Sequence, residues 1–164
     1  MEGPVYQQVY SYALRALTRR AHTSYELKQK LRTRPGCTAN IADEVIARLK
    51  EQGFLNDEDY VRRAVEYAVA YRLEGLSRLT QRLFAKGIPS EQTRSMWNSM
   101  EIDEEALAQK ILSKWGKRFV SLEPYERHQK TLALLQRRGL SLQFPLPNQI
   151  KAHRINSQND LEIQ

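Results

Sequence analysis

Cysteine is almost absent from this chain of 164 residues, because Cys37 is the one cysteine and no disulfide can form within the chain. A reducing compartment is the simplest setting for such a sequence, so we expect a cytoplasmic protein. There is no run of eighteen apolar residues, and the first residues lack the basic start and apolar stretch of a signal peptide. We therefore expect no membrane partner.

Glycine and proline are also scarce, at seven and six residues, which is few for an all-β chain with many turns. The apolar residues instead recur at steps of three and four, which is typical of amphipathic helices. Even the β-branched segment VRRAVEYAVAY keeps helical spacing of its valines and alanines. These patterns predict an all-α fold.

Motifs for catalysis and for metal or cofactor binding are missing. His22, His128 and His153 are scattered, and no two of them have the spacing of a helical zinc site. There is no glycine-rich phosphate loop and no nucleophile elbow, and acidic clusters at helix starts are explained by the helix dipole. We predict a protein that is not an enzyme, with no catalytic, metal or cofactor residues, and we place His22 and His128 on its surface.

What the chain does have is a repeat with a step of 52 residues. The step separates Leu31 from Leu83 and Leu83 from Leu135, and a glycine ends each of the three segments. The same step relates three cations, which are Arg34, Lys86 and Arg138. Repeats of this length are typical of stacked helical modules, in which function lies on a shared surface and not in one enclosed pocket.

Local signals place the boundaries of these modules. Thr23 and Glu26 have the spacing of a capping box at the start of a second helix, which Pro35 and Gly36 end. The same order of three helices occurs twice and then degrades, because residues 141–150 contain two prolines. We predict three-helix repeats at 1–53 and 54–100, a third repeat at 101–150 with an incomplete or irregular third helix, and a frayed polar tail at 151–164.

The net charge of +7 and the pI near 9.6 favour an anionic partner. The excess lies on the three second helices, at 24–34, 76–87 and 125–139, in each of which basic residues outnumber acidic ones by three. The middle segment has no acid, so Arg78, Arg82 and Lys86 are the leading candidates for contact with phosphates or an acidic protein. The other candidates are Lys28, Lys30, Arg32, Arg34, Arg127, Lys130, Arg137 and Arg138.

Two simpler interpretations stay open. The cations at the repeated position could merely complement the negative ends of their helices, and the others could form a solvated face. Tyrosines at positions 6, 10, 60, 67, 71 and 125 could stack on bases. Most of them have helical spacing beside apolar residues, which favours packing.

Three segments in order, SYELKQKL (24–31), GFLNDEDY (53–60) and LSRLTQRLFAKGI (76–88), resemble the RecX family of bacterial regulators of the RecA recombinase. The similarity extends from about Tyr10 to Gly139. It implies tandem three-helix repeats that form an elongated, curved array. It also implies binding along the groove of the RecA–single-stranded DNA filament, with modulation, usually inhibition, of strand exchange and coprotease activity. The family closes with a helix after the last glycine, where this chain has LSLQFPLP.

The resulting hypothesis is a monomeric, non-enzymatic regulator in DNA repair and the SOS response, with weak direct DNA binding left open. Two alternatives remain. One is an independent helix-turn-helix DNA-binding protein, although the third helices DEVIARLKEQ and TRSMWNSM are not basic in the way that a reader of bases favours. The other is a helical scaffold for protein interactions.

Overall fold

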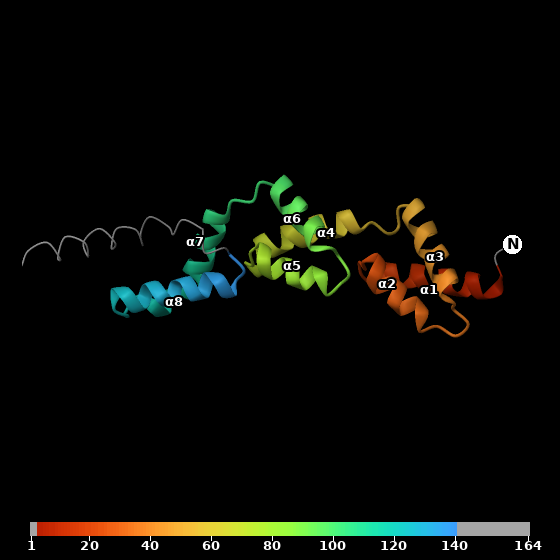
Figure 1. Ribbon diagram of the computed structural model, residues 1–164, viewed down its shortest axis with the longest axis horizontal. Coiled ribbons are helices and arrows are strands. Elements are labelled where there is room, and N and C mark those ends of the chain that lie inside the picture. Colours follow the sequence, from red (N-terminus) through yellow and green to blue (C-terminus); the bar gives the residue numbers. More distant parts are fainter. Residues whose placement is uncertain (1–2, 141–164) are drawn as a thin grey trace, which may run out of the picture. The chain divides into compact units, whose positions relative to one another are not determined.

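The computed structural model describes residues 3–140, and every regular element in that range is a helix (Figure 1). The prediction of an all-α fold is confirmed for these residues. The predicted irregular third helix of the last repeat, and the tail at 151–164, lie outside the described residues.

The first three helices pack around one core. They are α1 (Pro4–Arg19), α2 (Ser24–Arg32) and α3 (Ala39–Glu51). Ala13 of α1, Leu27 and Leu31 of α2, and Val45 and Leu49 of α3 are all fully buried in it. The helices are amphipathic and have 16, 9 and 13 residues, lengths at which a helix is at best marginally stable alone in water, so burial of these stripes holds the three together.

Capping residues define where these helices begin. The Thr23 hydroxyl accepts a hydrogen bond from the Glu26 amide at 3.1 Å, and the Glu26 carboxylate accepts one from the Thr23 amide at 3.3 Å. This is the predicted capping box. Thr38 caps α3 in a similar way, since its hydroxyl accepts from the Ile41 amide at 3.3 Å.

The next helices follow the predicted order, with one departure. Helix α4 (Asp57–Tyr67) has an acidic first turn and continues as a π-helix, η1 (Ala68–Arg72), which Leu73 ends in a left-handed conformation at φ 49°. A π-helix widens the turn and is frequent at functional sites. Helix α5 (Leu76–Phe84) and helix α6 (Ser90–Ser99) come next, with Leu79, Leu83 and Trp97 buried.

The last described helices are α7 (Glu104–Trp115), a 3₁₀ turn η2 (Gly116–Phe119) and α8 (Pro124–Arg137). The Asp103 carboxylate caps α7 by accepting from the Ala106 amide at 2.9 Å. Leu107, Ile111 and Leu135 are buried between these elements. The predicted helix from Tyr125 to Arg138, and its end at Gly139, are confirmed.

The 52-residue step corresponds to the same helix end formed three times. In each case the amide of the repeated cation donates to the carbonyl of the leucine three residues earlier, and a glycine with positive φ follows. The amide-to-carbonyl pairs are Arg34 to Leu31 (2.9 Å), Lys86 to Leu83 (2.9 Å) and Arg138 to Leu135 (3.1 Å), followed by Gly36, Gly87 and Gly139.

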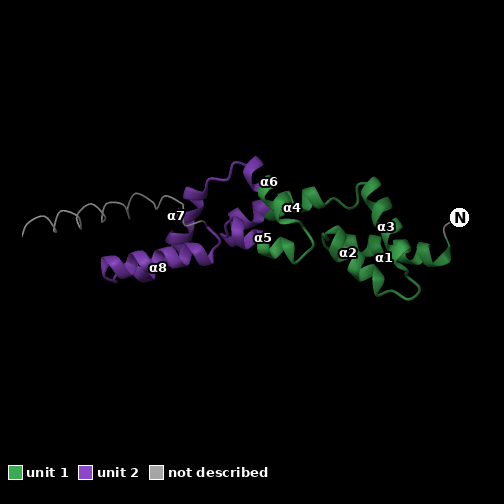
Figure 2. Ribbon diagram, in the orientation of Figure 1, with its two compact units in different colours: residues 1–64, 81–96 green, residues 65–80, 97–164 purple. Residues whose placement is uncertain are grey.

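The chain divides into two compact units (Figure 2). Unit 1 comprises residues 1–64 and 81–96, and unit 2 comprises residues 65–80 and the described part of the chain after residue 96. The division falls inside α4, α5 and α6, so packing groups residues differently from the predicted boundaries at 53 and 100. Compactness does not test repetition, and the assignment of three repeats stays a prediction.

We expect Gly139→Ala to lower the free energy of unfolding by about 2–4 kcal/mol, because left-handed strain and a backbone clash add up. Gly139 has φ 86°, and a Cβ there would lie 2.5 Å from the backbone nitrogen of Arg78. Gly53→Ala is the matched control, since Gly53 has φ 74° with nothing within 4 Å of its Cβ position. It should cost only about 1–2 kcal/mol. Urea unfolding followed by circular dichroism measures both, and equal losses would contradict the packing argument.

Candidate functional site

Lys86, one of the three leading contact candidates, has its charge partner inside the molecule. Its ammonium lies 2.7 Å from a carboxylate oxygen of Glu26 and 5.7 Å from the centre of the Tyr60 ring. Only 27% of the Lys86 side chain is exposed. Segment 76–87 contains no acid, but α2 supplies one from 60 residues away.

Both members of this pair keep their charge over a wide pH range. Burial raises the pKa of Glu26, but the hydrogen bonds from Lys86 and from the Thr23 amide outweigh it, so the pKa is lowered overall. Burial lowers the pKa of Lys86, and its contacts with Glu26 and Tyr60 outweigh that effect, so this pKa is raised. The pair is therefore part of the fold of unit 1.

The pair belongs to a contact that we call the first junction, in which the start of α2 (Thr23, Tyr25, Glu26) meets the end of α5 (Lys86, Gly87). The Thr23 hydroxyl donates to the Lys86 carbonyl at 2.6 Å. Tyr25 lies directly over Gly87, where any Cβ would overlap its side chain. The first junction thus joins a helix start to a helix end at van der Waals distance.

Unit 2 contains a second junction at the positions one repeat further along. The start of α5 meets the end of α8, and three donors of the former reach three carbonyls of the latter. They are the amide of Gly75 to Arg138 (2.7 Å), the amide of Ser77 to Gly139 (3.1 Å) and the guanidinium of Arg78 to Arg137 (2.9 Å).

The acid of the second junction comes from a different place. Arg78 occupies the position that corresponds to Glu26, and Glu74, at 1% exposure, supplies the carboxylate. Glu74 lies 3.3 Å from Arg72 and 3.5 Å from Arg78. Sequence reasoning missed Glu74, although a lone acid in the segment RLEGL was the available signal.

Arg138 packs its guanidinium 3.5 Å from the centre of the Trp115 ring. Burial and the neighbouring cations Arg78 and Arg72 lower its pKa, against the opposing effect of Glu74. Arg138 is thus held within unit 2 by an aromatic face.

The remaining candidates differ in exposure. Lys28 pairs with Asp43, and Arg127 donates to the Leu122 carbonyl at 2.9 Å. Arg82 is half-buried. The exposed candidates are Lys30, Arg32, Arg34, Lys130 and Arg137. The structure therefore separates cations that hold the fold together from cations that face solvent.

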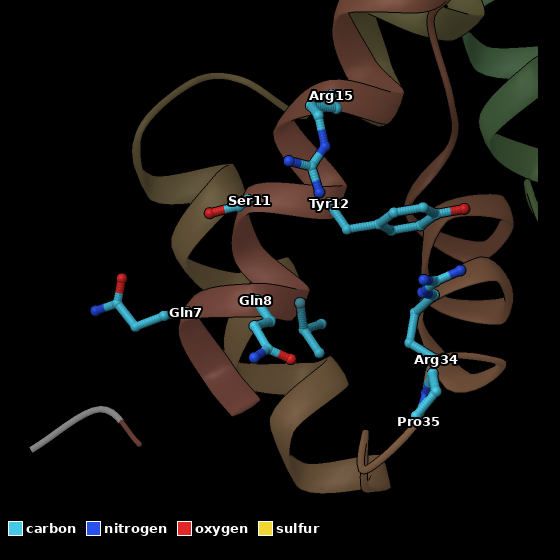
Figure 3. A pocket seen from close by; sticks show the side chains of 8 residues that line it. Gln7, Gln8, Ser11, Tyr12, Arg15, Arg34 and Pro35 are labelled. Carbon is cyan, nitrogen blue, oxygen red and sulfur yellow. The ribbon is translucent and has the colours of Figure 1, made fainter. Parts of the chain in front are cut away.

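One end of α2 borders a groove in unit 1 with a volume of about 510 Å³ (Figure 3). Arg34 lies over the Tyr12 ring at 4.4 Å from its centre, and Arg15 of α1 also lines the groove. No carboxylate is among the lining residues, which are Gln7, Gln8, Val9, Ser11, Tyr12, Arg15, Arg34 and Pro35.

The prediction that His22 lies on the surface is wrong, because only 3% of it is exposed. Its Nδ1 lies 2.9 Å from the Arg20 carbonyl, and its Nε2 lies 3.4 Å from the Lys30 ammonium. Burial lowers the pKa of His22, and the charges of Arg20 and Lys30 act in the same direction, against the opposing effects of the hydrogen bond with the Arg20 carbonyl and of the Glu26 charge. His22 directly precedes Thr23, the N-cap of α2.

The tyrosines divide as well. Tyr6 is buried, as packing predicts, but Tyr67, Tyr71 and Tyr125 are 52%, 71% and 77% exposed. The packing interpretation is wrong for these three. Tyr67 directly precedes the π-helix and Tyr71 belongs to it, and their rings lie 5.2 Å apart as an exposed aromatic pair.

Within residues 3–140, no three His, Cys, Asp or Glu side chains are grouped to hold a metal ion. The helices of that range are all too short or too polar to cross a bilayer. Burial raises the pKa of the Cys37 thiol, which keeps it protonated.

These observations define a class, an all-helical protein of short helices joined at their ends. A family model described as "RecX, first three-helix domain" matches residues 10–49, which cover most of α1 to α3. A "Regulatory protein RecX" from Thermus thermophilus is 30% identical over 148 residues, 90% of this chain and 92% of that protein. This chain belongs to the RecX family.

Two further comparisons concern length and fold. A "Regulatory protein RecX" from Mycobacteroides abscessus is 33% identical over 100 residues, which are 61% of this chain and 48% of that protein, so the chain spans about half of that relative. The crystal structure of RecX from Lactobacillus salivarius has a TM-score of 0.73 at 20% identity, and the match covers 96% of this chain and 98% of that one. It shows the same fold.

We expect Glu26 and Lys86 to be coupled by about 1 kcal/mol, as measured by a double-mutant cycle with Glu26→Gln and Lys86→Met. The low exposure of both side chains limits screening by solvent. Urea unfolding of the four proteins gives the coupling. The control is the exposed pair of Arg63 and Asp59, at 2.8 Å, which should show a smaller coupling energy. If the coupling energy of Glu26 and Lys86 were no larger than that of the control, the pair would not contribute to the stability of the first junction.

Stability should also depend on the ionisation of His22. Its pKa in the folded state is lowered below the value near 6.5 of the unfolded chain, so the unfolded state binds the proton first. The contribution is present above about pH 6.5 and is lost as the pH falls through that value toward the folded pKa. Compared with His22→Gln, the native chain should lose more unfolding free energy between pH 7.5 and pH 5.5. Equal losses of unfolding free energy in the two proteins between these pH values, measured by urea unfolding, would contradict this.

Proposed function

We propose that this protein is a cytoplasmic, non-enzymatic regulator that binds the RecA filament on single-stranded DNA as a monomer. Its expected effect is inhibition of the recombinase and coprotease activities in DNA repair. Membership of the RecX family is the observation that carries the proposal, since its relatives bear the name regulatory protein.

The charge distribution supports an anionic partner of this kind. A net charge of +7 attracts a nucleoprotein, and each phosphate that is neutralised releases counterions, so the binding should weaken with salt. Exposed cations on several helices allow many weak contacts along one filament to add together through effective concentration.

The structure changes which cations best test the proposal. Substituting Lys86 or Arg78 would disturb the junctions as well as any partner contact. Lys130 and Arg137 are exposed and lie seven residues apart on α8, which places them on the same helix face. This pair is therefore our preferred contact candidate.

Direct binding of single-stranded DNA is a second candidate activity. The exposed pair of Tyr67 and Tyr71, with rings 5.2 Å apart, supports it, because bases stack on aromatic side chains in such proteins.

We expect Lys130→Glu combined with Arg137→Glu to raise the concentration needed for half-inhibition of RecA ATPase on single-stranded DNA by about tenfold or more. The titration should be carried out at two salt concentrations, and the native protein should lose inhibition at the higher one. Lys110→Glu combined with Lys117→Glu is the matched control, with the same charge change at exposed sites.

Three results would count against the proposal. Absence of any effect of the native protein on RecA ATPase would remove the proposed regulation. Equal effects of the two double variants would remove Lys130 and Arg137 as contacts. Tight binding to DNA alone, with RecA unaffected, would favour the second candidate.

A further inference from the structure

The two junctions share a second feature besides their hydrogen bonds, which is a cation packed on an aromatic ring. At each, the cation at the end of a second helix rests on an aromatic ring of the helix before it, and a helix start covers the site. Lys86 lies 5.7 Å from the Tyr60 ring centre and is covered by the start of α2. Arg138 lies 3.5 Å from the Trp115 ring centre and is covered by the start of α5.

The end of α2 has the same construction. Arg34 makes the same turn with Leu31 and lies 4.4 Å from the Tyr12 ring centre. This end of α2 borders the groove of about 510 Å³ in unit 1 (Figure 3). The corresponding ends of α5 and α8, in contrast, each pack against the start of another helix.

One local difference decides what the groove offers to a partner. Pro35 is inserted before the glycine, and the Arg34 carbonyl accepts from the Cys37 amide at 3.1 Å. The carbonyl that receives Thr23 at the first junction is thus already engaged at the corresponding position here. The groove presents side chains instead, which are the guanidinium groups of Arg15 and Arg34 and the amides of Gln7 and Gln8.

Charge indicates the kind of occupant. At the first junction the arriving helix start brings Glu26, which neutralises Lys86 at 2.7 Å. The groove has two exposed guanidinium groups and no carboxylate among its lining residues, so its charge is complementary to an occupant that brings an acid. Arginine pairs with carboxylates in a planar, two-point geometry, and acidic residues are favoured in the first turn of helices.

We propose that this groove docks the acidic first turn of a helix from another protein, with its carboxylates on Arg15 and Arg34. A protein is favoured over a nucleic acid for two reasons. The same type of helix end receives a helix start twice within this chain. The Arg34 guanidinium also covers a face of Tyr12, which leaves that face unavailable for stacking with a base.

The test uses the full chain and a short alanine-rich helical peptide that begins Ser-Pro-Glu-Glu-Glu, with a second peptide carrying Gln in place of Glu. Fluorescence anisotropy measures the affinity, and amide NMR shifts locate the site. Arg15→Gln combined with Arg34→Gln should weaken binding of the acidic peptide at least about tenfold. Arg19→Gln combined with Arg94→Gln, at exposed sites of unit 1 outside the groove, should leave it unchanged.

A second variant guards against loss of folding. Arg34 packs on Tyr12, whereas Arg15 is an exposed residue that lines the groove, so Arg15→Gln alone should weaken binding in a protein with an unchanged melting temperature. Equal binding of the two peptides, or no loss in the Arg15 variant, would overturn the proposal.

Two other occupants are also tested. Oligothymidylate binding that is lost in the groove variant, without peptide binding, would assign the groove to nucleic acid. Self-association in sedimentation that depends on Arg15 and Arg34, again without peptide binding, would assign it to a second copy of the chain. Neither RecA nor its filament enters these measurements, so their failure leaves the proposed regulation standing.

Discussion

The junction between a helix start and a helix end is the contact on which the rest of this structure depends. Helices α2 and α5 have nine residues each, too few for stability in water, and their terminal peptide groups need partners. The first junction supplies a hydroxyl to the Lys86 carbonyl, and the second supplies an amide to the Arg138 carbonyl. A glycine at each contact lets the backbone approach closely, because a Cβ there would overlap its neighbour.

This constraint explains the placement of the charges. A cation at the end of a helix complements the helix dipole, and an aromatic ring beneath it shields the charge from part of the solvent. Lys86 then takes Glu26 as its acid, whereas the second junction relies on the buried Glu74. The repeated basic position therefore contributes to cohesion at the ends of α5 and α8, whereas Lys130 and Arg137 of α8 are exposed to solvent.

The groove of unit 1 differs from the two junctions in its charge. Arg34 and Tyr12 reproduce the cation and ring of a junction, but Arg15 adds a second positive charge beside them. At the two junctions an acid of the chain itself lies near the cation, whereas no carboxylate is among the residues that line the groove. The proposed regulation and the proposed docking of an acidic helix therefore rest on different residues, which are Lys130 and Arg137 for the first and Arg15 and Arg34 for the second.

The sequence by itself determined the helical class, the capping box at Thr23 and the helix end before Gly139, because these depend on residues that are close along the chain. It also determined the 52-residue step, because recurring residues can be compared without any knowledge of their contacts. Tertiary structure decided the rest. Glu26 meets Lys86 across 60 residues, His22 turns inward, and Tyr67 and Tyr71 turn outward. Periodicity identifies an apolar stripe, but only packing between distant segments determines which polar side chain finds a partner and which one faces solvent.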